Sequence, residues 1–320
     1  MKKNKIKDTG LEVTELSFGT SSLGSMPDTY GYEVSEDRAQ KTLNRFFQGP
    51  VNMLDTSRNY AMGESEKRIG KAIKENGGWP NGFLLSTKLD RNMDTLVLDK
   101  NRVRESLEES LKTLNVDSVD ILFLHDPEYA KDITDITKKD GAMDELFKIK
   151  NEGLAKAAGV AMGKVDIMFP LLKDWDFDVI INHNRYTLLN REANEMYDYA
   201  SSKNIAIFNA APYAGGVLAK GPDNFKKITY QDATEEKLAP AREFEKVCKK
   251  HNVELGAAAL QFSLRDNRIT STICGVTSVE SIEKNLAWAN AEISGEFWDE
   301  VLKLPFSSND PESDRVFTAG

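Results

Sequence analysis

Four side chains with complementary proton chemistry stand at, or just after, the ends of short apolar runs. They are Asp55, Tyr60, Lys88 and His125. A phenol with its usual pKa of about 10 is a poor acid or base at neutral pH, and we expect the Lys88 ammonium to lower the pKa of Tyr60. Asp55 would keep the lysine charged, and His125 would hydrogen-bond the substrate oxygen. The set predicts a proton relay, without a metal ion, in which Tyr60 protonates a carbonyl oxygen or deprotonates a hydroxyl while hydride moves at the carbon.

Each of these residues also has an ordinary structural interpretation. Lys88 and Asp55 could form a buried ion pair, His125 could be a hydrogen-bonded core histidine, and Tyr60 could serve only in packing. Arg58, inside the loop before Tyr60, could contact sugar hydroxyls or form a surface salt bridge. The occurrence of all four at matching run ends favours catalysis, because parallel strands of a barrel bring their carboxyl ends to one face.

The elements that would position these residues repeat one pattern: an apolar run, a polar turn and a helical segment. Runs that are apolar throughout are typical of strands buried on both faces. About eight such units occur, which predicts an α/β fold of the (β/α)8 TIM barrel type, with an open doubly wound sheet as the alternative. Lys5–Thr14 predicts an N-terminal β-hairpin that caps the barrel, and we expect residues 1–320 to form one domain. The predicted strands are Leu16–Thr20, Val51–Asp55, Phe83–Lys88, Val119–His125, Ala157–Ala161, Asp178–Asn182, Ile205–Ala210 and Ile269–Cys274.

Composition narrows the class of protein and its partners. Hydrophobic residues make up 40% and charged residues 29% of the 320 residues, which is typical of a globular protein, and no apolar run is long enough to span a membrane. The formal net charge of -9 disfavours nucleic acid and anionic membranes as partners. Cys248 and Cys274 lack CxxC spacing, which argues against a zinc site or a disulfide framework and fits the cytoplasm. These features leave a small molecule as the expected partner, and the sequence carries no signal of oligomeric state.

Sequence motifs that bind phosphate groups are missing. Neither GxGxxG nor GxxxxGKS/T occurs: the stretch from Gly63 to Lys71 ends in a Gly-Lys pair, but its spacing differs and Ala72 replaces the hydroxyl residue. Their absence argues against a P-loop and against a dinucleotide domain of the Rossmann type. It leaves open a cofactor bound at the mouth of a barrel.

Three segments together form a specific signature. They are Asp55-Thr56-Ser57 with Tyr60, Gly63, Ser65 and Glu66, then Ser86-Thr87-Lys88, then Leu124-His125-Asp126. The chain resembles the aldo-keto reductase superfamily in these segments, over about residues 9–290. The resemblance implies a (β/α)8 barrel, NAD or NADP bound without a Rossmann fold, and a catalytic tetrad of Asp55, Tyr60, Lys88 and His125 with Tyr60 as general acid and base.

Four longer strings point to one branch of that superfamily. They are Phe18-Gly19-Thr20-Ser21-Ser22-Leu23-Gly24, Thr87-Lys88-Leu89-Asp90-Arg91, His125-Asp126-Pro127-Glu128 and Asn184-Arg185-Tyr186-Thr187-Leu188-Leu189. They resemble the D-threo-aldose 1-dehydrogenase, L-fucose dehydrogenase and pyridoxal 4-dehydrogenase group, which implies oxidation of an L-fucose-type or D-arabinose-type aldose to a lactone. The alternatives are a general aldehyde or ketone reductase, a cofactor-binding regulatory subunit like the β subunits of potassium channels, and an unrelated barrel hydrolase or isomerase.

Cofactor contacts follow from the resemblance position by position, with several departures. Ala161-Met162 replace the Ser-Asn pair that holds the nicotinamide carboxamide in many relatives, His183 replaces a Gln, and Ala210 replaces a stacking Tyr. Gly275 and Ser281 stand where many relatives have a Lys and an Arg for the extra phosphate of NADP, which favours NAD, although Thr277, Ser278 or Lys284 could still contact that phosphate. The implied cofactor-binding residues are Gly19, Thr20, Asp55, His183, Pro212, Tyr213, Gly216, Leu218, Gly275, Thr277, Ser281 and Asn285.

Overall fold

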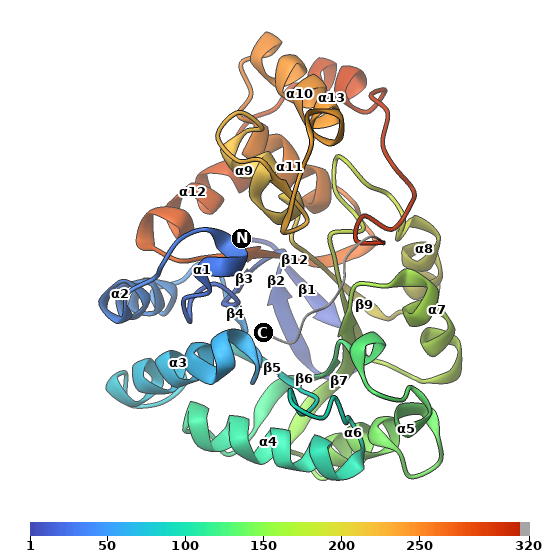
Figure 1. Cartoon of the computed structure of the whole chain (residues 1–320). Coiled ribbons are helices and arrows are strands. Elements are labelled where there is room, and N and C mark those ends of the chain that lie inside the picture. Colours follow the sequence, from blue (N-terminus) through green and yellow to red (C-terminus); the bar gives the residue numbers. More distant parts are fainter. Residues whose placement is uncertain (314–320) are drawn as a thin grey trace.

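A closed parallel barrel forms the centre of the molecule (Figure 1). In this computed structural model, which describes residues 1–313, the strands pair in the order β12-β3-β4-β5-β6-β7-β8-β9, and β9 returns to β12. All these pairings are parallel, so the predicted (β/α)8 TIM barrel is confirmed. The barrel strands are β3 (Leu16–Gly19), β4 (Met53–Asp55), β5 (Leu84–Leu89), β6 (Val119–His125), β7 (Ala155–Met162), β8 (Val179–His183), β9 (Ala206–Ala210) and β12 (Ile269–Gly275).

Helices surround the strands as an outer layer (Figure 1). Several begin at side chains that accept the unpaired amides of the first turn, such as Ser35 before α2, Asp99 before α4 and Thr234 before α10. The helices are α1 (Pro27–Tyr30), α2 (Glu36–Phe46), α3 (Glu64–Glu75), α4 (Lys100–Leu114), α5 (Thr134–Thr137), α6 (Ala142–Asn151), α7 (Val165–Asp174), α8 (Asn194–Ser202), α9 (Val217–Lys220), α10 (Glu235–Lys250), α11 (Leu255–Leu264), α12 (Val279–Ala289) and α13 (Gly295–Val301).

Two hydrophobic clusters stabilise this arrangement, one inside the barrel and one between strands and helices. Met53, Phe123 and Phe208 are completely or almost completely buried in the barrel interior. The predicted N-terminal hairpin is present: β1 (Lys3–Ile6) pairs with β2 (Leu11–Thr14) in antiparallel register. Its apolar side chains belong to the interior cluster, so the hairpin closes one end of the barrel and leaves the opposite end for a site.

The region between residues 212 and 235 is a long polar stretch in the sequence. The structure places α9 there, followed by a small hairpin of β10 (Lys227–Ile228) and β11 (Gln231–Asp232). Strands this short leave no periodic pattern to detect. This hairpin lies near the mouth, since Tyr230 next to it packs edge-on against Tyr30 of α1 with ring centroids 5.7 Å apart.

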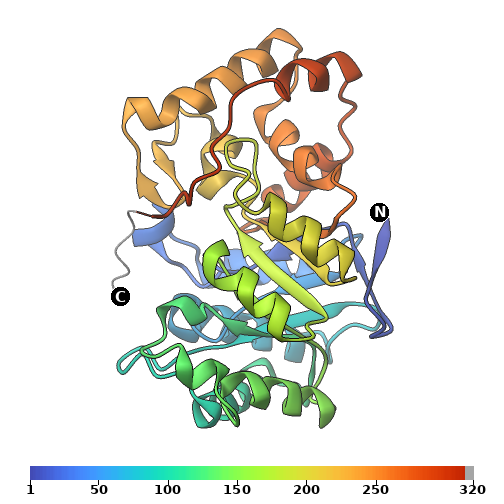
Figure 2. The ribbon, with the colours of Figure 1, turned by 90° about the vertical axis from the view of Figure 1, so that its right-hand side faces the viewer.

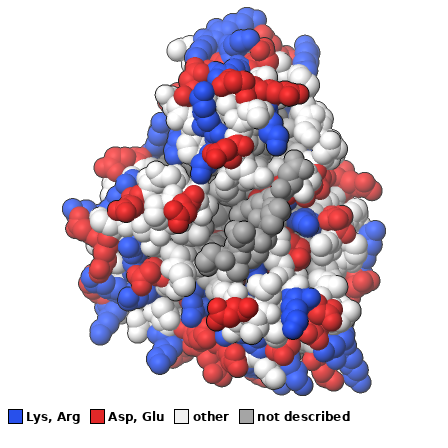
Figure 3. Space-filling view, in the orientation of Figure 1, with Lys and Arg blue, Asp and Glu red and all other residues white. Residues whose placement is uncertain are grey.

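The C-terminal segment crosses the molecule after α13. In Figure 2 it runs from α13 to the mouth of the barrel, the end opposite the N-terminal hairpin. Backbone hydrogen bonds tie it to the loop after β8: Ser307 N donates to the Leu189 carbonyl at 2.9 Å, and Arg191 N donates to the Ser307 carbonyl at 2.8 Å. On the face seen in Figure 3, positive and negative side chains are interspersed over the surrounding helices. None of the helices in residues 1–313 is long and apolar enough to cross a membrane.

Candidate active site

A buried ion pair lies at the base of the candidate site. Lys88 Nζ is 2.7 Å from Asp55 Oδ2 and donates to the Thr56 carbonyl at 2.6 Å. Ser86 Oγ donates to the other oxygen of Asp55 at 2.7 Å. Only 2% of the Lys88 side chain and 6% of the Asp55 side chain are exposed. The ion-pair interpretation is therefore correct, and the pair also lines the cavity described below, so the two interpretations do not exclude each other.

Tyr60 begins a strained turn between β4 and α3. This turn is the short helix η1 (Tyr60–Gly63), in which Ala61 and Met62 have positive φ values of 51° and 55°. Such backbone is costly for residues other than glycine and often marks a functional site. The phenol presents the face of its ring to Lys88, whose Nζ lies 4.5 Å from the ring centroid.

The surroundings of Tyr60 raise the pKa of its phenol well above the usual value. Burial is the largest cause, and the negative charges of Asp55, Asp126 and Asp90 add to it. The sequence predicted a lowered pKa for Tyr60, but the net shift is upward, because burial and the nearby carboxylates outweigh the Lys88 ammonium, which is paired with Asp55. A phenol with a raised pKa stays protonated at neutral pH, which suits it to donate a proton to a carbonyl oxygen.

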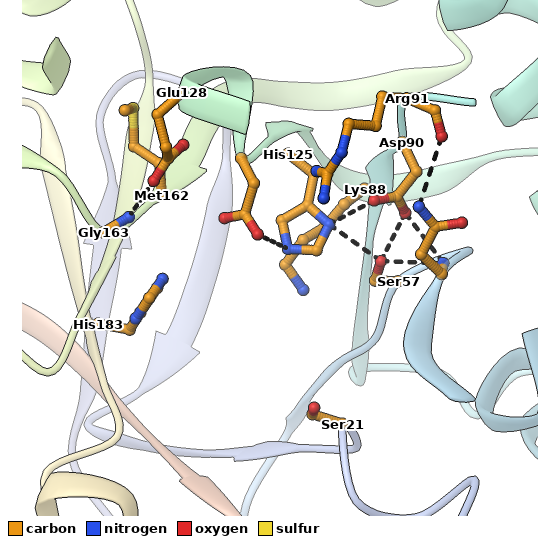
Figure 4. Close-up of polar contacts among 12 residues, drawn as sticks. Ser21, Ser57, Lys88, Asp90, Arg91, His125, Glu128, Met162, Gly163 and His183 are labelled. Atoms are coloured by element: carbon orange, nitrogen blue, oxygen red, sulfur yellow. Dashed lines mark hydrogen bonds and ion pairs between the residues drawn. The ribbon is translucent and has the colours of Figure 1, made fainter. Parts of the chain in front are cut away.

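His125 is held by a carboxylate that the sequence analysis did not assign. Asp90 Oδ1 lies 2.5 Å from His125 Nδ1, as Figure 4 shows. Asp90 Oδ2 accepts hydrogen bonds from Ser57 Oγ at 2.6 Å and from Asn59 N at 3.1 Å. The signal was present in the sequence: Asp90 follows Lys88 by two residues, and residues two apart in a strand point to the same face.

Asp90 and His125 stabilise each other's charged forms. Burial by itself would raise the pKa of Asp90, but the charge and the hydrogen bond of His125 outweigh it and lower that pKa. Burial would lower the pKa of His125, whereas Asp126 and Asp90 raise it. The bond to Asp90 occupies Nδ1 and leaves Nε2 for a ligand, so His125 is only half satisfied as a core histidine. Its ring lies edge-on to that of Tyr60, with centroids 5.7 Å apart.

Three residues whose roles the sequence left open have structural partners. Arg58 Nε lies 2.7 Å from Glu109 Oε2, so the salt-bridge interpretation of this residue is correct. Cys248 and Cys274 are free and buried, and burial raises the pKa of each thiol to about 12. A thiol with so high a pKa carries little thiolate at neutral pH, so neither cysteine is a nucleophile.

A cavity of about 790 Å³ at the mouth of the barrel joins these groups to the N-terminal end of α12. Asp55, Tyr60, Lys88 and His125 all line it. Of the expected cofactor residues, those that line it are Gly19, Asp55, His183, Tyr213, Gly216, Gly275, Thr277, Ser281 and Asn285. Thr20, Pro212 and Leu218 are buried outside the lining. The Thr20 hydroxyl donates to the Asp55 carbonyl at 2.9 Å, which gives it a structural role.

At the ends of β7 and β8 lie the positions that hold the nicotinamide carboxamide in many relatives, here Ala161, Met162 and His183. Ala161 lines the cavity, whereas Met162 is buried in the core outside it. His183 also lines the cavity, and its Nδ1 lies 3.7 Å from Glu312 Oε2 and 3.4 Å from Asn184 Nδ2. Burial lowers the pKa of His183, so the ring is neutral at neutral pH. A neutral imidazole has one donor and one acceptor nitrogen, which matches the two functions of a Gln amide.

A buried arginine holds the C-terminal segment close to His183 through two ion pairs. Arg185, only 1% exposed, pairs with Glu312 and lies 2.6 Å from Asp310. Thr229 Oγ1 donates to the Pro311 carbonyl at 3.2 Å. Arg185 and Glu312 are 127 residues apart in the chain, so the sequence of the C-terminal segment gives no indication of this contact. No periodicity records a contact between positions so distant.

The N-terminal end of α12 is closed by its own side chains. Ser281 Oγ accepts from Thr277 N and from Ser278 N, both at 3.0 Å, and Ser278 Oγ accepts from Ser281 N at 3.2 Å. These bonds occupy backbone amides that could otherwise bind an anion. A cation that the family pattern did not indicate also lies here: Arg38 of α2 lines the cavity, and its guanidinium donates to Thr277 Oγ1 at 3.4 Å.

The fold and this arrangement agree with known proteins. The model of the Aldo/keto reductase family matches residues 15–304. The chain belongs to the aldo/keto reductase family. It is 31% identical to L-galactose dehydrogenase of Arabidopsis thaliana over 284 residues, covering 88% of this chain and 85% of that protein. It is 27% identical to D-threo-aldose 1-dehydrogenase of Pseudomonas sp over 320 residues, which covers 92% of this chain and 94% of that protein. An aldo-keto reductase structure from Bacillus halodurans, in its holo form, matches with a TM-score of 0.77 at 20% identity, covering 99% and 100% of the two chains.

This aldo/keto reductase is an NAD(P)-dependent oxidoreductase, and the superfamily that the motifs indicated is confirmed. The residues of the cavity fit such a cofactor: neutral His183 faces the relay end, and the hydroxyls of Thr277 and Ser281 line the far end. When bound, the nicotinamide accepts or supplies the hydride, and the protein supplies binding, orientation and proton transfer.

Proposed function

We propose that this chain is an aldose 1-dehydrogenase, which oxidises a sugar at its anomeric carbon to a lactone. The observation that carries the proposal is the convergence of Asp55, Tyr60, Lys88 and His125 on the wall of one cavity. The similarity to L-galactose dehydrogenase and to D-threo-aldose 1-dehydrogenase supports the choice of a sugar as substrate.

Each residue of the relay has one role in this proposal. His125 Nε2 hydrogen-bonds the reacting oxygen and orients it, while Asp90 fixes the imidazole through Nδ1. In oxidation, Tyr60 takes the hydroxyl proton of the substrate, so that a carbon–oxygen double bond can form at a carbon whose hydride the nicotinamide, when bound, would accept. Lys88 favours the phenolate by its charge, and Asp55 keeps the ammonium in position. In reduction the same steps run in reverse.

A general aldehyde or ketone reductase is the second candidate. The raised pKa of Tyr60 favours it, because burial and the nearby carboxylates keep the phenol protonated and ready to donate. The two candidates share the relay and differ in the substrate and in the preferred direction.

The cofactor that we propose is NAD rather than NADP. Gly275 and Ser281 supply no cation, and the Ser281 hydroxyl already binds two backbone amides. Arg38, whose guanidinium reaches Thr277, and Lys284 also line this end of the cavity and oppose this preference. The two buried free thiols support the cytoplasmic setting that we propose.

The test is an oxidation screen of pentoses, deoxyhexoses and pyridoxal with both cofactors. We expect turnover with at least one aldose, and a kcat/KM for it above those for simple alcohols oxidised under the same conditions. Rapid reduction of test aldehydes without oxidation of any aldose would favour the reductase. Fluorescence titration with NADH and NADPH measures binding independently, and failure to bind either would contradict both candidates.

A further inference from the structure

Asp126 occupies an unusual position beside the relay. It directly follows His125 at the end of β6, and its φ of 43° lies in the left-handed region. The backbone is held there because Asp126 N donates to the Ala161 carbonyl at 2.9 Å. The side chain lines the cavity, and its Oδ2 lies 3.7 Å from His125 Nε2, beyond hydrogen-bond distance.

The Asp126 carboxylate lacks the partners that its surroundings call for. Its side chain is only 21% exposed, and Oδ1 is removed from solvent without a hydrogen-bond partner. Within residues 1–313, His125 provides its one ion-pair contact, at that distance of 3.7 Å. With Oδ1 shielded and without a donor, the carboxylate is poorly solvated, and a ligand hydroxyl in the cavity would supply a hydrogen bond to its other oxygen, Oδ2.

Glu128 lies behind Asp126 and does not compete for this role. Glu128 Oε1 accepts hydrogen bonds from Gly163 N at 3.0 Å and Lys164 N at 3.4 Å, the first of which Figure 4 draws. Burial, and next the charge of Asp126, raise the pKa of Glu128 to about 8. Glu128 does not line the cavity, so the carboxyl group that faces it on this side is that of Asp126.

We propose that Asp126 accepts a hydrogen bond from a substrate hydroxyl on the carbon next to the reacting carbonyl carbon. The inference rests on the proposed function, in which the reacting oxygen lies at His125 Nε2. A carboxylate 3.7 Å from that nitrogen is within reach of a hydroxyl on the carbon next to the one that carries the reacting oxygen. The substrate class is thus an α-hydroxy aldehyde or its cyclic form, as in aldoses, and a plain aldehyde leaves the carboxylate unpaired.

The sharpest test compares two aldehydes that differ by one hydroxyl, 2-hydroxypropanal and propanal. A hydrogen bond to a charged group corresponds to a preference of about 10- to 100-fold in kcat/KM for 2-hydroxypropanal over propanal. In Asp126→Asn we expect the preference to fall by about tenfold, because a neutral acceptor binds less strongly. In Asp126→Ala the preference should nearly disappear; the ratio of the two kcat/KM values is the readout, because the charge of Asp126 also raises the pKa of Tyr60 and His125 and its loss acts on both aldehydes alike.

Glu128→Gln is the matched control, because glutamine has the shape and the neutral charge of the protonated acid. We expect this variant to keep the preference for 2-hydroxypropanal. Equal losses for both aldehydes in Asp126→Ala, or an unchanged preference, would overturn the role of Asp126 and leave the proposed function intact. Titration with NADH verifies that each variant still binds cofactor. If the wild-type enzyme binds NADH and NADPH but turns over neither aldehyde nor any aldose, the proposed function fails, and this inference fails with it.

Discussion

Two sides of the cavity mouth, here called the first rim (the ends of β4, β5 and β6) and the second rim (the ends of β7, β8 and β12), differ in which parts of the chain supply the partners of their side chains. On the first rim, Asp55, Lys88 and Asp90 are bonded by side chains from neighbouring strands and their loops. On the second, His183 meets the C-terminal Glu312, and Thr277 meets Arg38 of α2. The chemistry thus depends on strand order and on the turn after β4 that carries Tyr60, whereas the cofactor end also depends on segments distant in sequence. We expect substitutions on the first rim to affect kcat, and those on the second to affect cofactor selectivity and affinity.

The largest effect is expected from Tyr60→Phe. Loss of the hydroxyl removes the proton donor and leaves the ring in place, so kcat should fall by at least about 10²-fold, the range of general acid–base catalysis. Cofactor affinity should remain within a few-fold, as measured by fluorescence titration. In the wild type, the raised pKa of Tyr60 predicts that oxidation quickens as pH rises and the phenolate forms, while reduction slows. Near wild-type turnover in Tyr60→Phe would show that another group moves the proton.

Lys88→Met should weaken both the relay and the fold. Asp55 would be left buried without its counterion, and breaking a buried pair costs about 3–5 kcal/mol of unfolding free energy. Loss of the ammonium also disfavours the phenolate, so the pH profile of oxidation should move upward or collapse. The control is Lys88→Met combined with Asp55→Asn, which should recover part of the stability in chemical denaturation but not the activity. An unchanged pH profile in active Lys88→Met enzyme would rule out the coupling of Lys88 to Tyr60.

Cofactor choice should respond to the second rim. We expect a higher kcat/KM with NAD than with NADP, and Ser281→Arg should move the ratio about tenfold toward NADP by adding a charge-assisted contact. Ser281→Arg should also lower the free energy of unfolding by about 0.5–2 kcal/mol, because Ser281 takes part in the capping box of α12. Arg38→Ala should lower kcat/KM with NADP and leave that with NAD almost unchanged. A clear wild-type preference for NADP, lost in Arg38→Ala, would show that Arg38 replaces the missing pair of cations.

The smallest effect is expected at the C-terminal segment. Glu312→Gln keeps the shape of the side chain but removes a carboxylate 3.7 Å from His183 Nδ1, so the Kd of NADH should rise by less than about tenfold while kcat changes little. Asp310→Asn is the matched control, because Asp310 contacts Arg185 at 2.6 Å and makes no ion pair with His183 in the part of the chain that the structure describes. Equal effects of the two substitutions would assign Glu312 to the stability of the segment alone.

The sequence by itself determined the barrel and the first rim. Eight apolar runs with helical segments between them have few other ways to bury both strand faces, and parallel register then brings the residues at the strand ends to one face. Asp55, Lys88 and His125 lie together for this reason. Asp90 could have been added to them by the same rule of alternation, since it is two residues beyond Lys88.

Only the tertiary structure decided the pKa of Tyr60 and the second rim. The pKa of a buried phenol depends on burial and on all the surrounding charges, so the net shift could not be predicted from Lys88 alone. The contact of Arg38 with Thr277 spans 239 residues, and that of Arg185 with Glu312 spans 127. Contacts so distant in sequence leave no local propensity or periodicity in either partner, because they form only after the barrel has closed and the C-terminal segment has crossed its mouth.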